Sequence, residues 1–375
     1  MDVVLSENQA MLQETTRRFV QSRSPVTLLR KLADSGSSYP GEAWRECAQQ
    51  GWIALLTPQE HGGMGEDAEG VIDAAIVAEE LGRVVFAGPF LPASVVAFAI
   101  ARSGSGAQQA LLLPGIASGE LRAAWCFAGT GPQAGLAPEG VRAKQRDGGF
   151  MLDGVAGFVE DAQHADHLLV TAASADGLSQ FILPAQTHGI TIEPLRSLDL
   201  GRPLARVRFE QVEAGADALV GEAGSAAADF ERQLQVALVL QCAEQVGLID
   251  RALEFTLDYV QQRVAFGRPI GSFQALKHRL ADHVAELESA KAATAHAAKA
   301  VQNDAPDAAI AVSIAKSQCG KCGTVIIRDC VQMHGGIGLT WEHDLHFYLR
   351  RAVSNEALWG TPALHHERLC GLAGL

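Results

Sequence analysis

The sequence lacks the features that mark membrane, secreted and nucleic-acid-binding proteins. No apolar run approaches the ~20 residues that a membrane helix needs. Residues 1–7 show no basic segment followed by an apolar stretch, so we expect no signal peptide. Lys and Arg number 30 against 43 Asp and Glu, and the formal net charge of −13 argues against a phosphate backbone as partner.

Cysteine is also scarce, with seven in 375 residues. A long chain of this kind without a leader is typical of reduced thiols, so we expect a cytoplasmic protein. Cys319 and Cys322 have the spacing of a redox or zinc motif, but no second pair stands at a suitable distance to complete a zinc site. We therefore expect no metal and interpret the pair as small residues at a helix interface.

The chain is rich enough in apolar residues to form a globular protein, with 48% hydrophobic and 19% charged residues. The pattern of apolar and turn residues changes twice along the chain. Helical apolar spacing dominates to about residue 118, short β-rich runs with turn residues follow, and helical spacing returns near residue 223. We predict an α+β fold made of an N-terminal helical domain (1–118), a middle antiparallel β domain (119–222) and a C-terminal four-helix bundle (223–375).

Two segments of the last block carry chemistry that suits a dinucleotide. Arg263 offers a fork of donors to phosphate oxygens. Phe266, three residues on, would lie near it if the helix persists, and it offers a flat face to an adenine. Gly267 is then expected to end that helix. Gln332 can donate to and accept from an adenine or ribose edge, while Gly335 and Gly336 allow close backbone approach.

Taken together these segments resemble the flavin-adenine signature of the acyl-CoA dehydrogenase family. The resemblance extends over essentially the whole chain. It includes an E-E-L-G helix end at residues 79–82, an L-P-x-x-x-x-G-E entry to the β domain at 113–120, and the stretch W-E-H-D-L-H at 341–346, which fits a bacterial subgroup.

The resemblance implies a flavoprotein that oxidises an acyl-CoA substrate with FAD and passes electrons to an electron-transfer flavoprotein, in fatty acid or sterol catabolism. It also implies a homo- or hetero-oligomer with an acyl-CoA dehydrogenase homologue. In such oligomers the adenine-side residues of one subunit contact the flavin of its neighbour. The expected cofactor-binding residues are Arg263, Phe266, Gln274, Gln332, Gly335 and Gly336.

The usual catalytic base is missing. Removing the proton from the acyl Cα needs a carboxylate beside that atom. Trp359 stands where most of the family has this glutamate, and Ala237 stands where a minority place it in the long helix. Neither side chain can take a proton, and Trp359 would fill volume where substrate lies.

Other family positions depart as well. Leu238 replaces an arginine beside the helix position, and the β-domain run 126–135 keeps its glycines but loses a Ser-Asp pair. Phe158 keeps the aromatic face that covers the flavin, while Glu160 replaces the threonine that follows it.

Among other polar groups, Glu244 is the one weak candidate for a displaced base, because it lies alone in an apolar run about 10 Å along the helix from Ala237. The alternative for Glu244, a buried ion pair between helices or subunits, is favoured. Glu356 is expected to be solvated, and His334 to form an ordinary helix-end hydrogen bond.

Two functions stay open. The chain is either an acyl-CoA dehydrogenase with an unrecognised base, or a non-catalytic partner subunit that completes the FAD site of a catalytic homologue in a hetero-oligomer.

Overall fold

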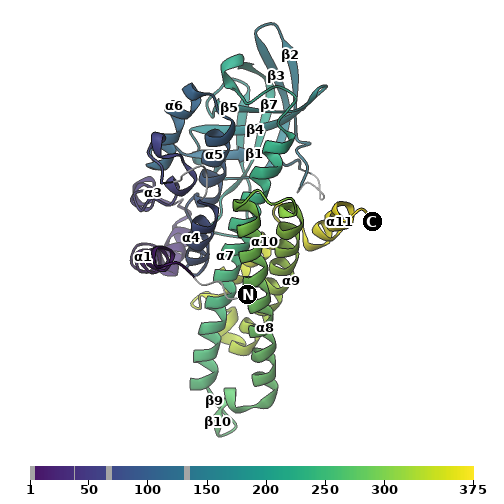
Figure 1. Cartoon of the computed structure of the whole chain (residues 1–375). Coiled ribbons are helices and arrows are strands. Elements are labelled where there is room, and N and C mark those ends of the chain that lie inside the picture. Colours follow the sequence, from purple (N-terminus) through teal and green to yellow (C-terminus); the bar gives the residue numbers. More distant parts are fainter. Residues whose placement is uncertain (1–4, 38, 65–69, 131–135) are drawn as a thin grey trace.

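The computed structural model describes residues 5–37, 39–64, 70–130 and 136–375, and it has the expected order of helices, sheet and helices (Figure 1). The expected α+β fold class is confirmed. The expected boundaries at 118 and 222 fall between α6 and β1 and between β8 and α7, and the exact division into domains stays a prediction.

The N-terminal part is helical. Its first and last helices begin at capping boxes, in which Ser6 pairs with Gln9 and Ser105 with Gln108. The second helix is not apparent from the sequence, because a proline that follows a helix usually ends it; in the structure Pro25 is the N-cap of the second helix. The helices are α1 Glu7–Arg23, α2 Val26–Ser35, α3 Gly41–Ala48, α4 Val71–Gly82, α5 Phe90–Ser103 and α6 Gly106–Ala117.

The middle part is an eight-stranded sheet in the order β6-β7-β3-β2-β4-β5-β8, with β1 paired to β4 off that path. Most pairs are antiparallel, as expected, but β1 and β2 each run parallel to β4, so the sheet is mixed. The chain must cross over between β1 and β4, and the β2–β3 hairpin forms that connection. The strands are β1 Ala123–Cys126, β2 Val141–Arg146, β3 Gly149–Glu160, β4 His167–Ser174, β5 Gly177–Pro184, β6 Ile190–Pro194, β7 Leu204–Gly215 and β8 Leu219–Val220.

The C-terminal part is a helical bundle. The predicted long helix is α7, Ala227–Gln262, and it crosses from the sheet to the far tip of the molecule, where a small hairpin joins it to α8 (Figure 1). The remaining elements are β9 Val264–Ala265, β10 Arg268–Pro269, α8 Gln274–Gln302, α9 Ala308–His334, α10 Leu345–Ala357 and α11 Pro362–Leu372.

Strand β1 joins the two cores. Its residues alternate, so that Ala124 and Cys126 pack into the sheet core, while Trp125 and, just beyond the strand, Phe127 pack into the core shared by the helices. Side chains of β1 therefore line the junction between sheet and bundle.

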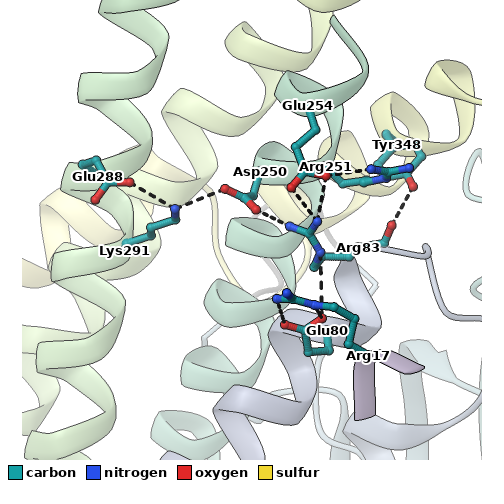
Figure 2. A network of polar contacts seen from close by, with 9 residues as sticks. All are labelled: Arg17, Glu80, Arg83, Asp250, Arg251, Glu254, Glu288, Lys291 and Tyr348. Atoms are coloured by element: carbon teal, nitrogen blue, oxygen red, sulfur yellow. Dashed lines mark hydrogen bonds and ion pairs between the residues drawn. The ribbon is translucent and has the colours of Figure 1, made fainter. Parts of the chain in front are cut away.

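Ion pairs hold the N-terminal helices on the bundle (Figure 2). Arg83, which caps α4, pairs with Asp250 and Glu254 of α7, and its carbonyl accepts from Tyr348 of α10. Arg17 of α1 pairs with the fully buried Glu80. Lys291 of α8 lies 3.1 Å from Asp250 and extends the network. These contacts fix the orientation of α4, α7 and α8, the frame that positions the site.

Within the described residues, no helix is long and apolar enough to span a membrane.

Candidate functional site

The predicted adenine-side residues gather at one end of the bundle. Arg263, Phe266 and Gln274 lie at or beside the β9–β10 hairpin, and Gln332, Gly335 and Gly336 lie at the end of α9. The two groups are held together by Tyr259 of α7, whose ring stacks on His334 at 4.3 Å and whose hydroxyl donates to the His334 carbonyl. Residues far apart in sequence thus form one surface.

The helix does not persist through the signature, contrary to the expectation. Helix α7 ends at Gln262, Arg263 is its C-cap, and Phe266 and Gly267 form the left-handed turn of the β9–β10 hairpin with φ of 53° and 76°. Gly267 therefore turns the hairpin rather than ending the helix. The consequence is exposure: Phe266 is 93% accessible, and its ring contacts Phe273 edge-on.

Arg263 and the glycines are also open to a ligand. Arg263 is exposed and forms no ion pair with the described residues, so its guanidinium is available to a phosphate. A Cβ added at Gly335 or Gly336 would meet nothing within 4 Å. His334 is buried and donates from Nδ1 to the Cys330 carbonyl at 2.8 Å, the helix-end role expected of it.

The expected base position on α7, Ala237, lies deeper in the protein, on one stripe of that helix. Phe230, Ala237 and Glu244 follow one another at spacings of seven residues, close to two helical turns, and all three are buried. Ala237 and its neighbour Leu238 are both 0% exposed. The stripe therefore runs from an aromatic residue through the empty base position to a carboxylate.

Glu244 is engaged on both oxygens. Arg351 Nη1 donates to Oε1 at 2.6 Å and Arg202 Nη2 to Oε2 at 2.7 Å, while Asn355 Nδ2 also donates to Oε2. Burial alone would raise the pKa of Glu244, but the two guanidiniums and the amide lower it to about 2. A carboxylate with so low a pKa is a poor general base, so the geometry favours the ion-pair interpretation.

Glu160 of β3 belongs to the same cluster. Its Oε2 lies 3.2 Å from Arg202 Nε, and its side chain is 9% exposed. Burial raises the pKa of Glu160 to about 7, although Arg202 opposes the shift. The sequence did not predict Arg202, Asp199, Arg351 or Asn355 as members of this cluster; the available signal was that a lone buried Glu needs cationic partners.

Trp359 occupies the usual base position with its indole 8% exposed. It packs edge-on against Trp125 of β1, with ring centroids 5.9 Å apart. Glu356, expected to be solvated, instead accepts a 2.6 Å hydrogen bond from Thr324 of α9. No protonatable group replaces the base at Trp359.

The β-domain departures are only partly described. Residues 131–135 of the run 126–135 lie outside the described part of the chain. Phe158 sits at an irregular step of β3 with φ 53° and is 43% exposed, so its ring remains available as a cover.

The cysteine pair does not form a site of its own. Cys319 and Cys322 are both buried in α9, and Cys319 faces Thr294 of α8 at 3.4 Å. No group of three metal-ligating side chains occurs in residues 5–37, 39–64, 70–130 and 136–375.

The residues expected at the adenine end of FAD suit that group, whereas those expected at its flavin ring do not. The exposed Arg263, the exposed Phe266 and the unobstructed glycines suit an adenine and pyrophosphate presented from outside. Glu160, at the position where the resemblance implies a hydroxyl donor, forms an ion pair with Arg202, and the buried Trp359 stands where the resemblance implies the base.

Comparison with known proteins gives the family. Residues 6–120 match the acyl-CoA dehydrogenase N-terminal domain, and residues 228–370 match the acyl-CoA dehydrogenase C-terminal domain. The acyl-CoA dehydrogenase IpdE2 of Mycobacterium tuberculosis is 32% identical over 95% of this chain and 94% of its own.

Solved structures agree. The ChsE4-ChsE5 complex from Mycobacterium tuberculosis has a TM-score of 0.90 at 26% identity, covering 100% of this chain and 99% of that one. A variant of the Tcur3481-Tcur3483 steroid ACAD has a TM-score of 0.89 at 28% identity, covering 98% of each chain. The chain therefore belongs to the acyl-CoA dehydrogenase family, and it is an acyl-CoA dehydrogenase or a subunit of one.

Proposed function

We propose that this chain is the non-catalytic subunit of a hetero-oligomeric, FAD-dependent acyl-CoA dehydrogenase. The observation that carries the proposal is Trp359, buried at the base position while the adenine-side residues stay exposed. The chain keeps the residues expected to contact the FAD of a neighbouring subunit, and it has lost the carboxylate that its own reaction would need.

The chemistry of acyl-CoA desaturation explains why this loss matters. FAD supplies the hydride acceptor when it is bound. The protein must supply a base beside the acyl Cα, in hydrogen-bonding reach of the proton. Ala237 and Trp359 have no titratable group, and Glu244 is held by two arginines. We assign Glu244 to interdomain packing and the base to the homologous partner.

The adenine-side surface defines this chain's contribution. Arg263 would pair with the pyrophosphate, Phe266 would cover the adenine or ribose, and Gln274 and Gln332 would donate to nearby polar edges. Gly335 and Gly336 would allow close backbone approach. Two structural relatives, ChsE4-ChsE5 and Tcur3481-Tcur3483, are each named as a pair of proteins, which supports an assembly of unlike chains.

The remaining parts of the proposal follow from the assembly. Its substrate would be an acyl-CoA, its electron acceptor an electron-transfer flavoprotein, and its compartment the cytoplasm. Six of the seven thiols are buried and unpaired, which suits a reducing environment.

The visible spectrum of this chain, purified alone and then with short and long acyl-CoA added anaerobically, tests the proposal. We expect a colourless chain, or a yellow one that no acyl-CoA bleaches. The same chain co-purified with a base-bearing homologue should hold flavin that acyl-CoA bleaches. Bleaching by this chain alone would instead show a complete enzyme with an unrecognised base.

A further inference from the structure

Four aromatic side chains from three parts of the fold pack together, with Trp125 at their centre. We call this set, Trp125, Phe127, Phe230 and Trp359, the aromatic plug. The ring centroids of Trp125 lie 4.2 Å from Phe127, 5.8 Å from Phe230 and 5.9 Å from Trp359. Each member is at most 8% exposed, so the rings fill the space between β1, α7 and the loop that follows α10.

The loop that carries Trp359 has an unfavourable backbone. Trp359 has φ 58°, a left-handed value that costs a bulky residue, and Gly360 follows with φ 96°. A Cβ at Gly360 would lie 2.8 Å from the His365 ring. Such a conformation persists only where the surroundings determine it.

Two buried donors hold this loop by its carbonyls. Lys316 Nζ of α9 donates to the Leu358 carbonyl at 2.8 Å and to the Asn355 carbonyl at the end of α10. His365 Nε2 of α11 donates to the Trp359 carbonyl at 3.1 Å. Lys316 is 2% exposed and His365 is 0% exposed, so neither bond competes with bulk water.

The donors act on the backbone and leave the indole free to pack. Burial lowers the pKa of Lys316 to about 8 and that of His365 to about 4. His365 is therefore neutral at pH 7 and bonds as a fixed tautomer, with Nε2 protonated. Lys316 and His365 thus hold the loop through its carbonyl oxygens, and these hydrogen bonds involve no carboxylate.

We propose that Trp359 closes the acyl compartment of this chain, and that Lys316 and His365 are positioning residues that keep it closed. Trp125 packs against the indole, and Phe127 and Phe230 pack against Trp125, so removing the indole is expected to leave an apolar cavity beside Trp125 that accepts a flat apolar group. This inference rests on the proposed function only in identifying the Trp359 position as the one beside the acyl Cα.

Indole is the direct probe, because it is the group removed. We expect Trp359→Gly in the full-length assembly to bind indole at least tenfold more tightly than the wild type, measured by titration calorimetry. Phe230→Ala should open the same compartment from the α7 side and keeps the test available if the first variant does not fold. The control is Trp341→Ala, which removes an indole that is 39% exposed on the surface.

The positioning role has its own readout. His365→Gln keeps an amide donor for the Trp359 carbonyl, whereas His365→Leu has none. We expect His365→Leu to bind indole with Trp359 still present, because the released loop lets the indole ring leave, and His365→Gln to resemble the wild type.

Tight indole binding by the wild type would overturn the proposal that Trp359 closes this compartment. Folded Trp359→Gly and Phe230→Ala variants that do not bind indole would overturn it as well. Equal indole binding by His365→Leu and His365→Gln would overturn the positioning role. Both indole measurements are independent of the anaerobic acyl-CoA spectrum. They can therefore contradict this inference without contradicting the proposed function.

Discussion

Arg202 donates to the carboxylate of Glu244 across 2.7 Å and so ties the loop before β7 to the middle of α7. Both side chains are at most 3% exposed. The same Arg202 reaches Glu160 of β3, and Arg351 of α10 completes the pairing of Glu244. One buried cluster thus joins the sheet, the long helix and α10.

Glu244→Gln should destabilise the protein by about 3 kcal/mol, because removing one partner leaves two buried guanidiniums short of a countercharge. Urea unfolding measures this loss. The matched control is Glu254→Gln, whose carboxylate is 42% exposed and pairs with Arg83, and a much smaller loss is expected there. Flavin bleaching by the assembly should survive Glu244→Gln below its unfolding temperature; abolished bleaching in a folded variant would make Glu244 the base.

Glu160 predicts an unusual pH dependence. Its folded pKa of about 7 lies above the ordinary value of 4.5, so the folded chain holds this proton more tightly than the unfolded chain. The stabilisation is complete below pH 4.5 and is lost as the pH rises through 7. Arg202, Glu244, Arg351 and Asp161 are the charged groups acting on it.

Glu160→Gln removes that titration. The variant should gain stability relative to the wild type between pH 5.5 and pH 8, as measured by urea unfolding at both values. The opposite shift of Glu244, whose pKa is about 2, acts in a separate window below pH 4.5 and does not obscure the comparison. A constant difference between the two proteins across this range would show that Glu160 titrates normally.

Arg263→Ala should weaken flavin retention by the co-purified assembly by about tenfold or more, since a charge-assisted hydrogen bond contributes roughly 1.5–3 kcal/mol. Flavin content after gel filtration provides the measurement. Arg18→Ala, an exposed cation on α1, is the control. Unchanged flavin content in Arg263→Ala would count against the adenine-side assignment.

Trp359→Glu should not by itself restore acyl-CoA oxidation. The new carboxylate would face Trp125, and Leu238 would remain where the family often has an arginine. Anaerobic bleaching of bound flavin is the assay. A clear rate from this single change would show that only the base was missing.

Thiol reactivity tests the buried cysteines. Only Cys370 is exposed among the seven, and burial raises the pKa of Cys47 and of Cys330 to about 11. We expect one thiol to react with a chromogenic disulfide reagent in the native protein and seven in denaturant. Fast reaction of the Cys319–Cys322 pair in the native protein would revive the redox interpretation.

The sequence predicted the order of the three parts because each has its own periodicity. Apolar spacing of three and four marked α8, and strict alternation marked β7. It failed where local signals had two meanings. Pro25 both follows one helix and precedes another, and the segment 263–267 has residues that suit either a helix end or a hairpin turn.

The candidate site also has features that the sequence predicted and features that only the tertiary structure shows. The sequence by itself determined that the adenine-side residues are present and that Trp359 and Ala237 replace the base, because these are statements about residue types at recognisable positions. Only the tertiary structure decided that Glu244 is held by Arg202 and Arg351. It also decided that Trp125 packs against Trp359 and Phe230 against Trp125, and that Lys316 and His365 hold the Trp359 loop. These contacts join residues from separate elements, and their geometry depends on how strands and helices pack, which no local pattern in the chain encodes.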